Sequence, residues 1–75
     1  MVASMKKRHL AALLRQVRVE ANLTQGQVAG RIGQTQSYVS KYENGEQRLD
    51  LTELEAVCTA VGIPVTEFVR RYLEG

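Results

Sequence analysis

Cysteine and histidine are scarce in this chain of 75 residues, which holds one of each, Cys58 and His9. A single cysteine cannot form an internal disulfide, and the two residues together are too few for a four-ligand zinc site. Neither has a partner that would make it a catalytic nucleophile or base, which argues against an enzyme. We therefore expect a cytoplasmic protein without metal, cofactor or small-molecule ligand, in which Cys58 is a small core residue.

Long apolar runs are also missing. None approaches the roughly 18 residues needed to cross a bilayer, and residues 1–4 are too few for the apolar region of a signal peptide. We therefore expect no membrane partner. The chain has one proline, with neither a low-complexity tract nor a linker. These features predict one domain over residues 1–75, with residues 1–5 as a flexible tail.

Acidic residues are rare in the first part of the chain. Residues 1–42 hold seven lysines and arginines and one acid, whereas residues 43–75 hold three lysines and arginines and seven acids. This asymmetry favours a polyanion-binding surface in the basic part. A charged face that is merely solvated would give the same distribution.

Apolar spacing predicts five helices and no strand. The first helix runs from about residue 6 to residue 20 and has an apolar stripe typical of an amphipathic helix. That stripe consists of Leu10, Leu13, Leu14, Val17 and Ala21. A short second helix begins at a capping box of Thr24 and Gln27 and stops at Gly33, which can adopt left-handed dihedrals.

The remaining three helices follow at similar spacing. Thr35 is the expected N-cap of the third helix, which ends at Asn44 and Gly45. The loop of residues 46–50 is expected to pin Leu49, and with it Leu51, to the core. A second capping box, Thr52 with Glu55, opens the fourth helix, and Gly62 closes it. The fifth helix starts at Pro64 and repeats apolar residues at Val65, Phe68, Val69 and Tyr72.

The third helix has a polar face of unusual composition. With about 100° per residue, one side of this helix collects Gln36, Ser37, Ser40, Lys41 and Asn44, hereafter the polar face. A helix that needs only solubility usually carries Glu and Lys there, whereas Gln, Asn, Lys and Ser are side chains that read base edges in the major groove. A solvated helix that happens to lack Glu remains the alternative.

The second helix favours the base-reading interpretation. Two helices joined by a short turn can cross steeply only with a small residue at their contact and a turn residue free to adopt positive φ. The later helix of such a pair must also contribute a branched apolar side chain to the contact between the two helices. Ala29, Gly33 and Val39 meet these requirements in order, so the segment is predicted to be a helix-turn-helix.

The chain resembles the XRE family, the regulators related to phage Cro and cI repressors. Arg18, "LTQGQVA" at 23–29, Gly33, "SYVSKYENG" at 37–45 and the region from Leu49 to Leu54 carry the resemblance, which spans about residues 7–72. It implies an all-α, five-helix, lambda-repressor-like DNA-binding domain whose third helix is the recognition helix.

The resemblance also implies roles for individual residues. It assigns base contacts to Gln36, Ser37 and Lys41, with Ser40 or Tyr38 at the periphery. Phosphate contacts fall to Gln25, Asn44 and Arg48, although Glu46 and Asp50 place negative charge beside Arg48. Arg18 and Glu43 match an ion pair between the first and third helices. That pair is interpreted as mainly scaffold, with a secondary electrostatic role.

One recognition helix reads only a few base pairs, so we expect a homodimer on an inverted repeat of double-stranded DNA. Val69, Tyr72 and Leu73 of the last helix are the candidate dimer interface; the alternative is that they complete the monomer core. The predicted function is a sequence-specific transcriptional regulator that acts as a repressor. A restriction-modification controller protein and an antitoxin-type protein-binding module are the alternatives.

Overall fold

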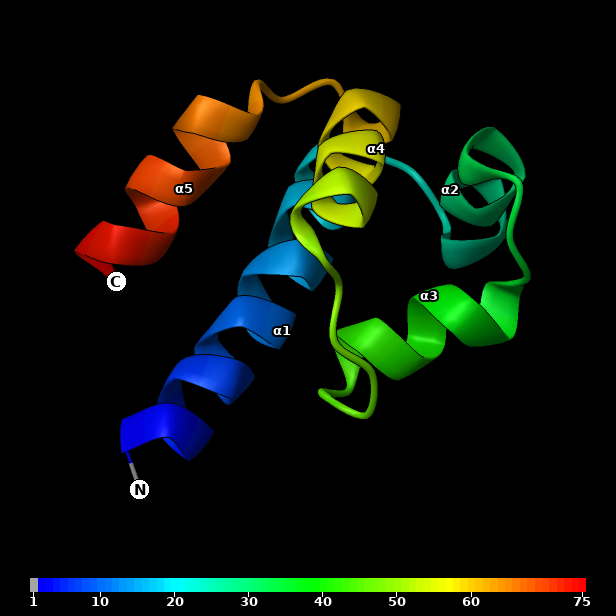
Figure 1. The fold of residues 1–75 in the computed structure, drawn as a ribbon. Helices are drawn as coiled ribbons and strands as arrows, with labels where there is room; N and C mark the ends of the chain where they lie inside the picture. The colour runs from blue at the N-terminus through cyan, green and yellow to red at the C-terminus, as the bar shows by residue number, and fades with distance from the viewer. Residues whose placement is uncertain (1) are drawn as a thin grey trace.

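The computed structural model describes the backbone of residues 2–75 and the side chains of residues 9–75. Over residues 2–75 the chain forms five α-helices and no strand, as predicted (Figure 1). The helices are α1 (Val2–Glu20), α2 (Gln25–Ile32), α3 (Gln36–Glu43), α4 (Leu51–Val61) and α5 (Val65–Glu74). Lys6, Lys7 and Arg8, which contribute to the basic part of the sequence, lie outside the described side chains.

Most predicted helix ends are confirmed. The hydroxyl of Thr24 accepts a hydrogen bond from the backbone N–H of Gln27 at 3.1 Å, and the Gln27 side-chain oxygen accepts from the backbone N–H of Thr24 at 2.8 Å. Gly33 ends α2 with φ of 68°, a conformation that costs a residue with a Cβ about 1–2 kcal/mol. Thr35 caps α3 by accepting from the N–H of Tyr38 at 3.2 Å.

Two helices begin earlier than predicted. Residues 2–5, expected as a tail, belong to α1, which is consistent with the high helix propensity of alanine and methionine in this stretch. For α4, the predicted capping box of Thr52 and Glu55 is wrong. Asp50 is the N-cap: its carboxylate accepts from the N–H of Glu53 at 2.7 Å, and the Glu53 carboxylate accepts from the N–H of Asp50 at 2.8 Å.

The error at α4 has a physical reason. The sequence contains two overlapping capping-box patterns, and an aspartate is at least as good an N-cap as a threonine. The earlier start makes Leu51 the first residue of the helix, where it is 72% exposed, so it is not pinned to the core. Leu49 does pack against the core, as expected.

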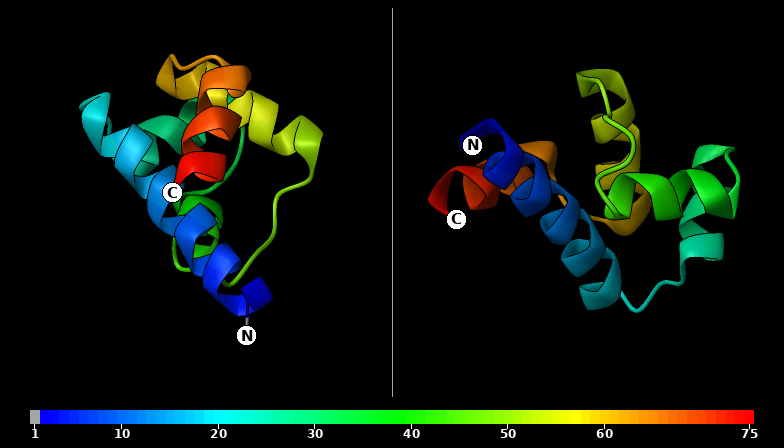
Figure 2. Two further views of the ribbon diagram at one scale, coloured as in Figure 1. Left: turned by 90° about the vertical axis from the view of Figure 1, so that its left-hand side faces the viewer. Right: turned by 90° about the horizontal axis from the view of Figure 1, so that it is seen from below.

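The five helices surround one core (Figures 1 and 2), to which α2 contributes the buried Val28 and Ala29. Its largest fully buried side chains are Tyr42 of α3 and Phe68 of α5. Cys58 is buried as predicted, and burial raises the pKa of its thiol. Since a thiol with a raised pKa holds little of the reactive thiolate, Cys58 is a packing residue.

Candidate nucleic-acid interface

The contact between α2 and α3 has the predicted helix-turn-helix arrangement. The two helices pack on each other and cross instead of lying side by side (Figure 1). Val28 and Ala29 of α2 and Val39 of α3 are all buried. The small residue, Ala29, and the branched apolar residue, Val39, therefore both lie in the core, as required. With Gly33 in the left-handed conformation between the helices, all three predicted requirements are met.

The polar face of α3 lies at the surface. Gln36, Ser37, Lys41 and Asn44 are exposed and Ser40 is half-buried, whereas Val39, Tyr42 and Glu43 on the other side of the helix are buried. The only hydrogen bond among described side chains on the polar face is a weak one of 3.4 Å, from the Asn44 amide to the Ser40 hydroxyl. Its donors and acceptors are therefore free to bind a ligand.

Tyr38, which the resemblance places at the periphery of the base contacts, does not share this exposure. Its side chain is half-buried, and its hydroxyl donates to the Glu53 carboxylate of α4 at 3.0 Å. Its ring lies edge-on to Tyr42. Burial, reinforced by the bond to Glu53, raises the pKa of Tyr38. Tyr38 therefore links α3 to α4 in this structure, because the helical period of about 100° per residue places it on the side of α3 opposite Gln36.

The ion pair between α1 and α3 is present and largely buried. The Arg18 guanidinium donates from Nε to Glu43 Oε2 at 2.7 Å and from Nη2 to Glu43 Oε1 at 3.1 Å, a bidentate arrangement. The side chains are 12% and 2% exposed, and the hydrogen bond to Glu43 raises the pKa of Arg18. Arg18 also donates to the Leu23 carbonyl at 2.8 Å, which fixes the turn before α2.

Gln25 joins the same network. Its amide donates to Glu43 Oε1 at 3.1 Å, a contact that the sequence pattern did not reveal. One amide hydrogen and the side-chain oxygen have no partner among the described residues, so the assignment as a phosphate contact keeps a free donor. Through Glu43 the first turn of α2, the end of α3 and Arg18 of α1 are held as one unit.

The apolar residues of α5 fall into a buried group and an exposed group. Phe68 is buried, and the ring of Tyr72 is half-buried and stacks on His9 of α1 at a centroid distance of 5.6 Å. Val69 and Leu73 are 37% and 71% exposed. Tyr72 therefore serves mainly the monomer, whereas Val69 and Leu73, one helical turn apart, leave an apolar strip on the surface of α5.

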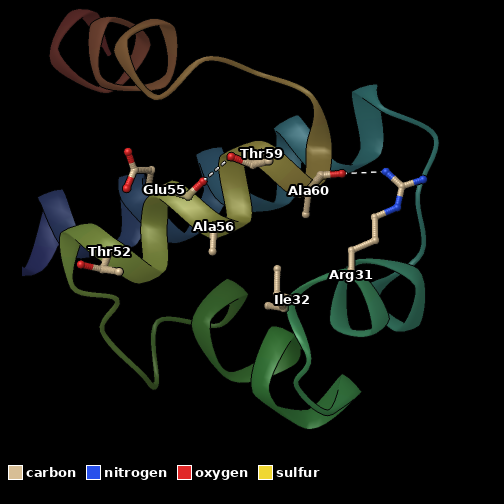
Figure 3. A pocket seen from close by; sticks show the side chains of 7 residues that line it. All are labelled: Arg31, Ile32, Thr52, Glu55, Ala56, Thr59 and Ala60. Carbon is tan, nitrogen blue, oxygen red and sulfur yellow. Dashed lines mark hydrogen bonds between the residues drawn. The ribbon is translucent and has the colours of Figure 1, made fainter.

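An open hollow lies away from the polar face, between α2 and α4 (Figure 3). It has a volume of about 700 Å³, is open to solvent, and is lined mainly by small residues of α4 together with Arg31 and Ile32. The Arg31 guanidinium donates to the Ala60 carbonyl at 2.7 Å (Figure 3). This cation therefore serves as a tie between the two helices.

Two further features are absent from the part of the chain that the structure describes. No three histidine, cysteine or carboxylate side chains in that part of the chain gather in a way that could hold a metal ion. None of the five helices is both long enough and apolar enough to span a membrane.

The family comparison agrees with the geometry. Residues 9–70 match the model of a helix-turn-helix domain family. No curated protein is significantly similar to the chain.

Several solved structures share the fold. An XRE-family-like protein from Pseudomonas syringae pv. tomato is 33% identical with a TM-score of 0.89, and 97% of this chain and 89% of that chain are covered. The clp gene regulator ClgR from C. glutamicum is 25% identical with a TM-score of 0.83, covering 92% and 88%. The restriction-modification controller protein C.AhdI from Aeromonas hydrophila is 27% identical with a TM-score of 0.77, covering 83% and 94%. The chain therefore belongs to the XRE family of helix-turn-helix proteins.

Proposed function

We propose that this protein is a sequence-specific transcriptional regulator that binds double-stranded DNA through the polar face of α3. The observation that carries the proposal is the exposure of that face on a helix held by a buried ion pair and crossed by α2. Gln36 suits bidentate bonding to adenine, Lys41 suits guanine, and Ser37 and Ser40 are adaptable. Asn44 at the end of this face, Gln25 at the start of α2 and Arg48 in the loop after α3 would bind phosphates.

The proposed active species is a homodimer. A single recognition helix reads too few base pairs to select one site among the competing sites in a genome. The apolar strip of Val69 and Leu73 on α5 offers a surface for a second copy, with Tyr72 at its border. Two copies related by a two-fold axis would read an inverted repeat whose half-sites lie about 34 Å apart.

The proposed mode of action is repression in the cytoplasm. Residues 1–75 would act as one DNA-binding domain, and an occupied operator would exclude polymerase. The similarity to the controller protein C.AhdI, at 27% identity, favours control of a restriction-modification system as the alternative context. Both contexts use the same polar face. An antitoxin-type module would instead bind its protein partner as its main activity.

Selection of binding sites from a random duplex pool tests this function. We expect a palindromic consensus with half-sites one helical turn apart, and binding that weakens steeply with salt, by about −0.9 in the log–log slope for each phosphate contacted. Failure to enrich any sequence, together with a salt-independent affinity, would contradict DNA binding and favour the protein-binding alternative.

A further inference from the structure

The pairing of cations is uneven over the molecule. Seven lysine and arginine side chains lie among residues 9–75. Four of them are occupied: Arg18 by Glu43, Arg31 by the Ala60 carbonyl, Arg70 by Glu67 and Glu74, and Arg71 by Glu20 and Glu67. The three without a bond to any described side chain or backbone group are Arg15, Lys41 and Arg48.

Two of these three unpaired cations already belong to the proposed interface. Lys41 is on the polar face and Arg48 is in the loop that follows α3. Arg15 is on α1 and has no role in the function proposed above, yet it lies in the same region. It is exposed, one helical turn before Arg18, whose guanidinium holds the end of α3.

Arg15 lines a hollow that reaches α3. The hollow has a volume of about 440 Å³ and is formed by Ala11, Ala12 and Arg15 of α1 with Glu43 and Asn44 at the end of α3. The two elements approach closely here, since a Cβ built on Gly45 would lie 4.0 Å from the Cβ of Ala11. The side chains of Ala11 and Ala12 are short, so they leave room on the α1 side of the hollow for a bulky group to reach Arg15 and Asn44.

The charges in the hollow favour an anion. The Glu43 carboxylate is 2% exposed and is engaged by Arg18 and Gln25, so it offers little negative charge to Arg15. A guanidinium presents several N–H donors in a geometry that matches phosphate oxygens. The Asn44 amide adds a further donor, because its 3.4 Å bond to Ser40 uses only one of its hydrogens.

We infer that Arg15 and Asn44 form a phosphate-binding site that holds the DNA backbone between α1 and the end of α3. The inference rests on the proposed function and extends the DNA contact surface from the helix-turn-helix onto α1. Because phosphates carry no sequence information, this site contributes to affinity and register and not to base preference.

The test compares Arg15→Gln with wild type on the selected operator and on an unrelated duplex. We expect binding to weaken by the same factor on both, and the log–log salt slope to become shallower by about 0.9 for each bound protomer. Between 50 and 200 mM salt, this amounts to roughly a 3.5-fold smaller loss of affinity per protomer. Arg15→Lys should restore most of the slope. Arg31→Gln removes the same charge on the side of the α2–α4 hollow, and should leave the slope unchanged.

A second arm locates the phosphate. Single phosphates of the operator are replaced by neutral methylphosphonates. One position in each half-site should weaken the wild type but not Arg15→Gln. If Arg15→Gln keeps the wild-type slope and the wild-type sensitivity at every position, the inference is wrong while DNA binding stands. If the wild type itself shows no salt-dependent binding, the proposed function and the inference both fall.

Discussion

Replacing Glu43 by alanine is expected to lower the free energy of unfolding by about 3–5 kcal/mol. The substitution strands the Arg18 guanidinium, which is 12% exposed and loses both of its bonds to the carboxylate. It also removes the acceptor of the Gln25 amide, so α1, α2 and α3 lose their common tie. Urea unfolding followed by circular dichroism measures the change.

A matched control separates this effect from the removal of a negative charge in general. Glu46→Ala removes an exposed carboxylate three residues later and should change stability by no more than about 0.5 kcal/mol. Equal stability of the two variants would mean that the buried ion pair does not hold the recognition helix.

Introducing aspartate at both Val69 and Leu73 is expected to abolish dimerisation and to weaken operator binding by about 10²- to 10⁴-fold. The two side chains are 37% and 71% exposed, so the substitutions should leave the monomer folded while placing charge in the proposed interface. A dimer engages both half-sites with one binding event, and a monomer loses that advantage. Sedimentation and titration of the full operator measure the two effects.

The control uses the same substitution on another exposed leucine. Leu51→Asp alters a side chain that is 72% exposed at the first position of α4, where an acidic residue is compatible with the helix dipole. It should leave dimerisation and DNA binding intact. If Leu51→Asp dissociates the dimer and the α5 variant does not, the copies associate through α4. If the wild type is a monomer at high concentration, the proposed α5 interface is wrong.

Local signals predicted most of this fold. The capping box of Thr24 and Gln27 and the glycine at position 33 act within a few residues of the chain, so the bounds of α2 could be predicted from the sequence. The start of α4 could not, because Asp50 with Glu53 and Thr52 with Glu55 satisfy the same pattern. The structure places Asp50 at the N-cap, and aspartate is at least as good a cap as threonine, but the spacing pattern alone does not separate the two.

For the candidate site, too, features set by local spacing could be predicted, whereas contacts between distant residues could not. The exposure of Gln36, Ser37 and Lys41 follows from the helical period and was predicted. The bond from Tyr38 to Glu53 and the bond from Gln25 to Glu43 span 15 and 18 residues, and depend on how α3 meets its neighbours. The family resemblance placed Tyr38 at the periphery of the base contacts, although the structure directs its hydroxyl to Glu53 of α4.

The most direct test of base reading by the polar face measures wild type and Gln36→Ala on the selected operator and on every single-base-pair variant of it. We expect Gln36→Ala to cost about 1–3 kcal/mol on the operator and to lose discrimination at one base pair in each half-site. Gln16→Ala, on the exposed side of α1, should retain the wild-type profile. A uniform weakening of binding by Gln36→Ala on all sequences, with discrimination intact at every position, would contradict base reading by the polar face.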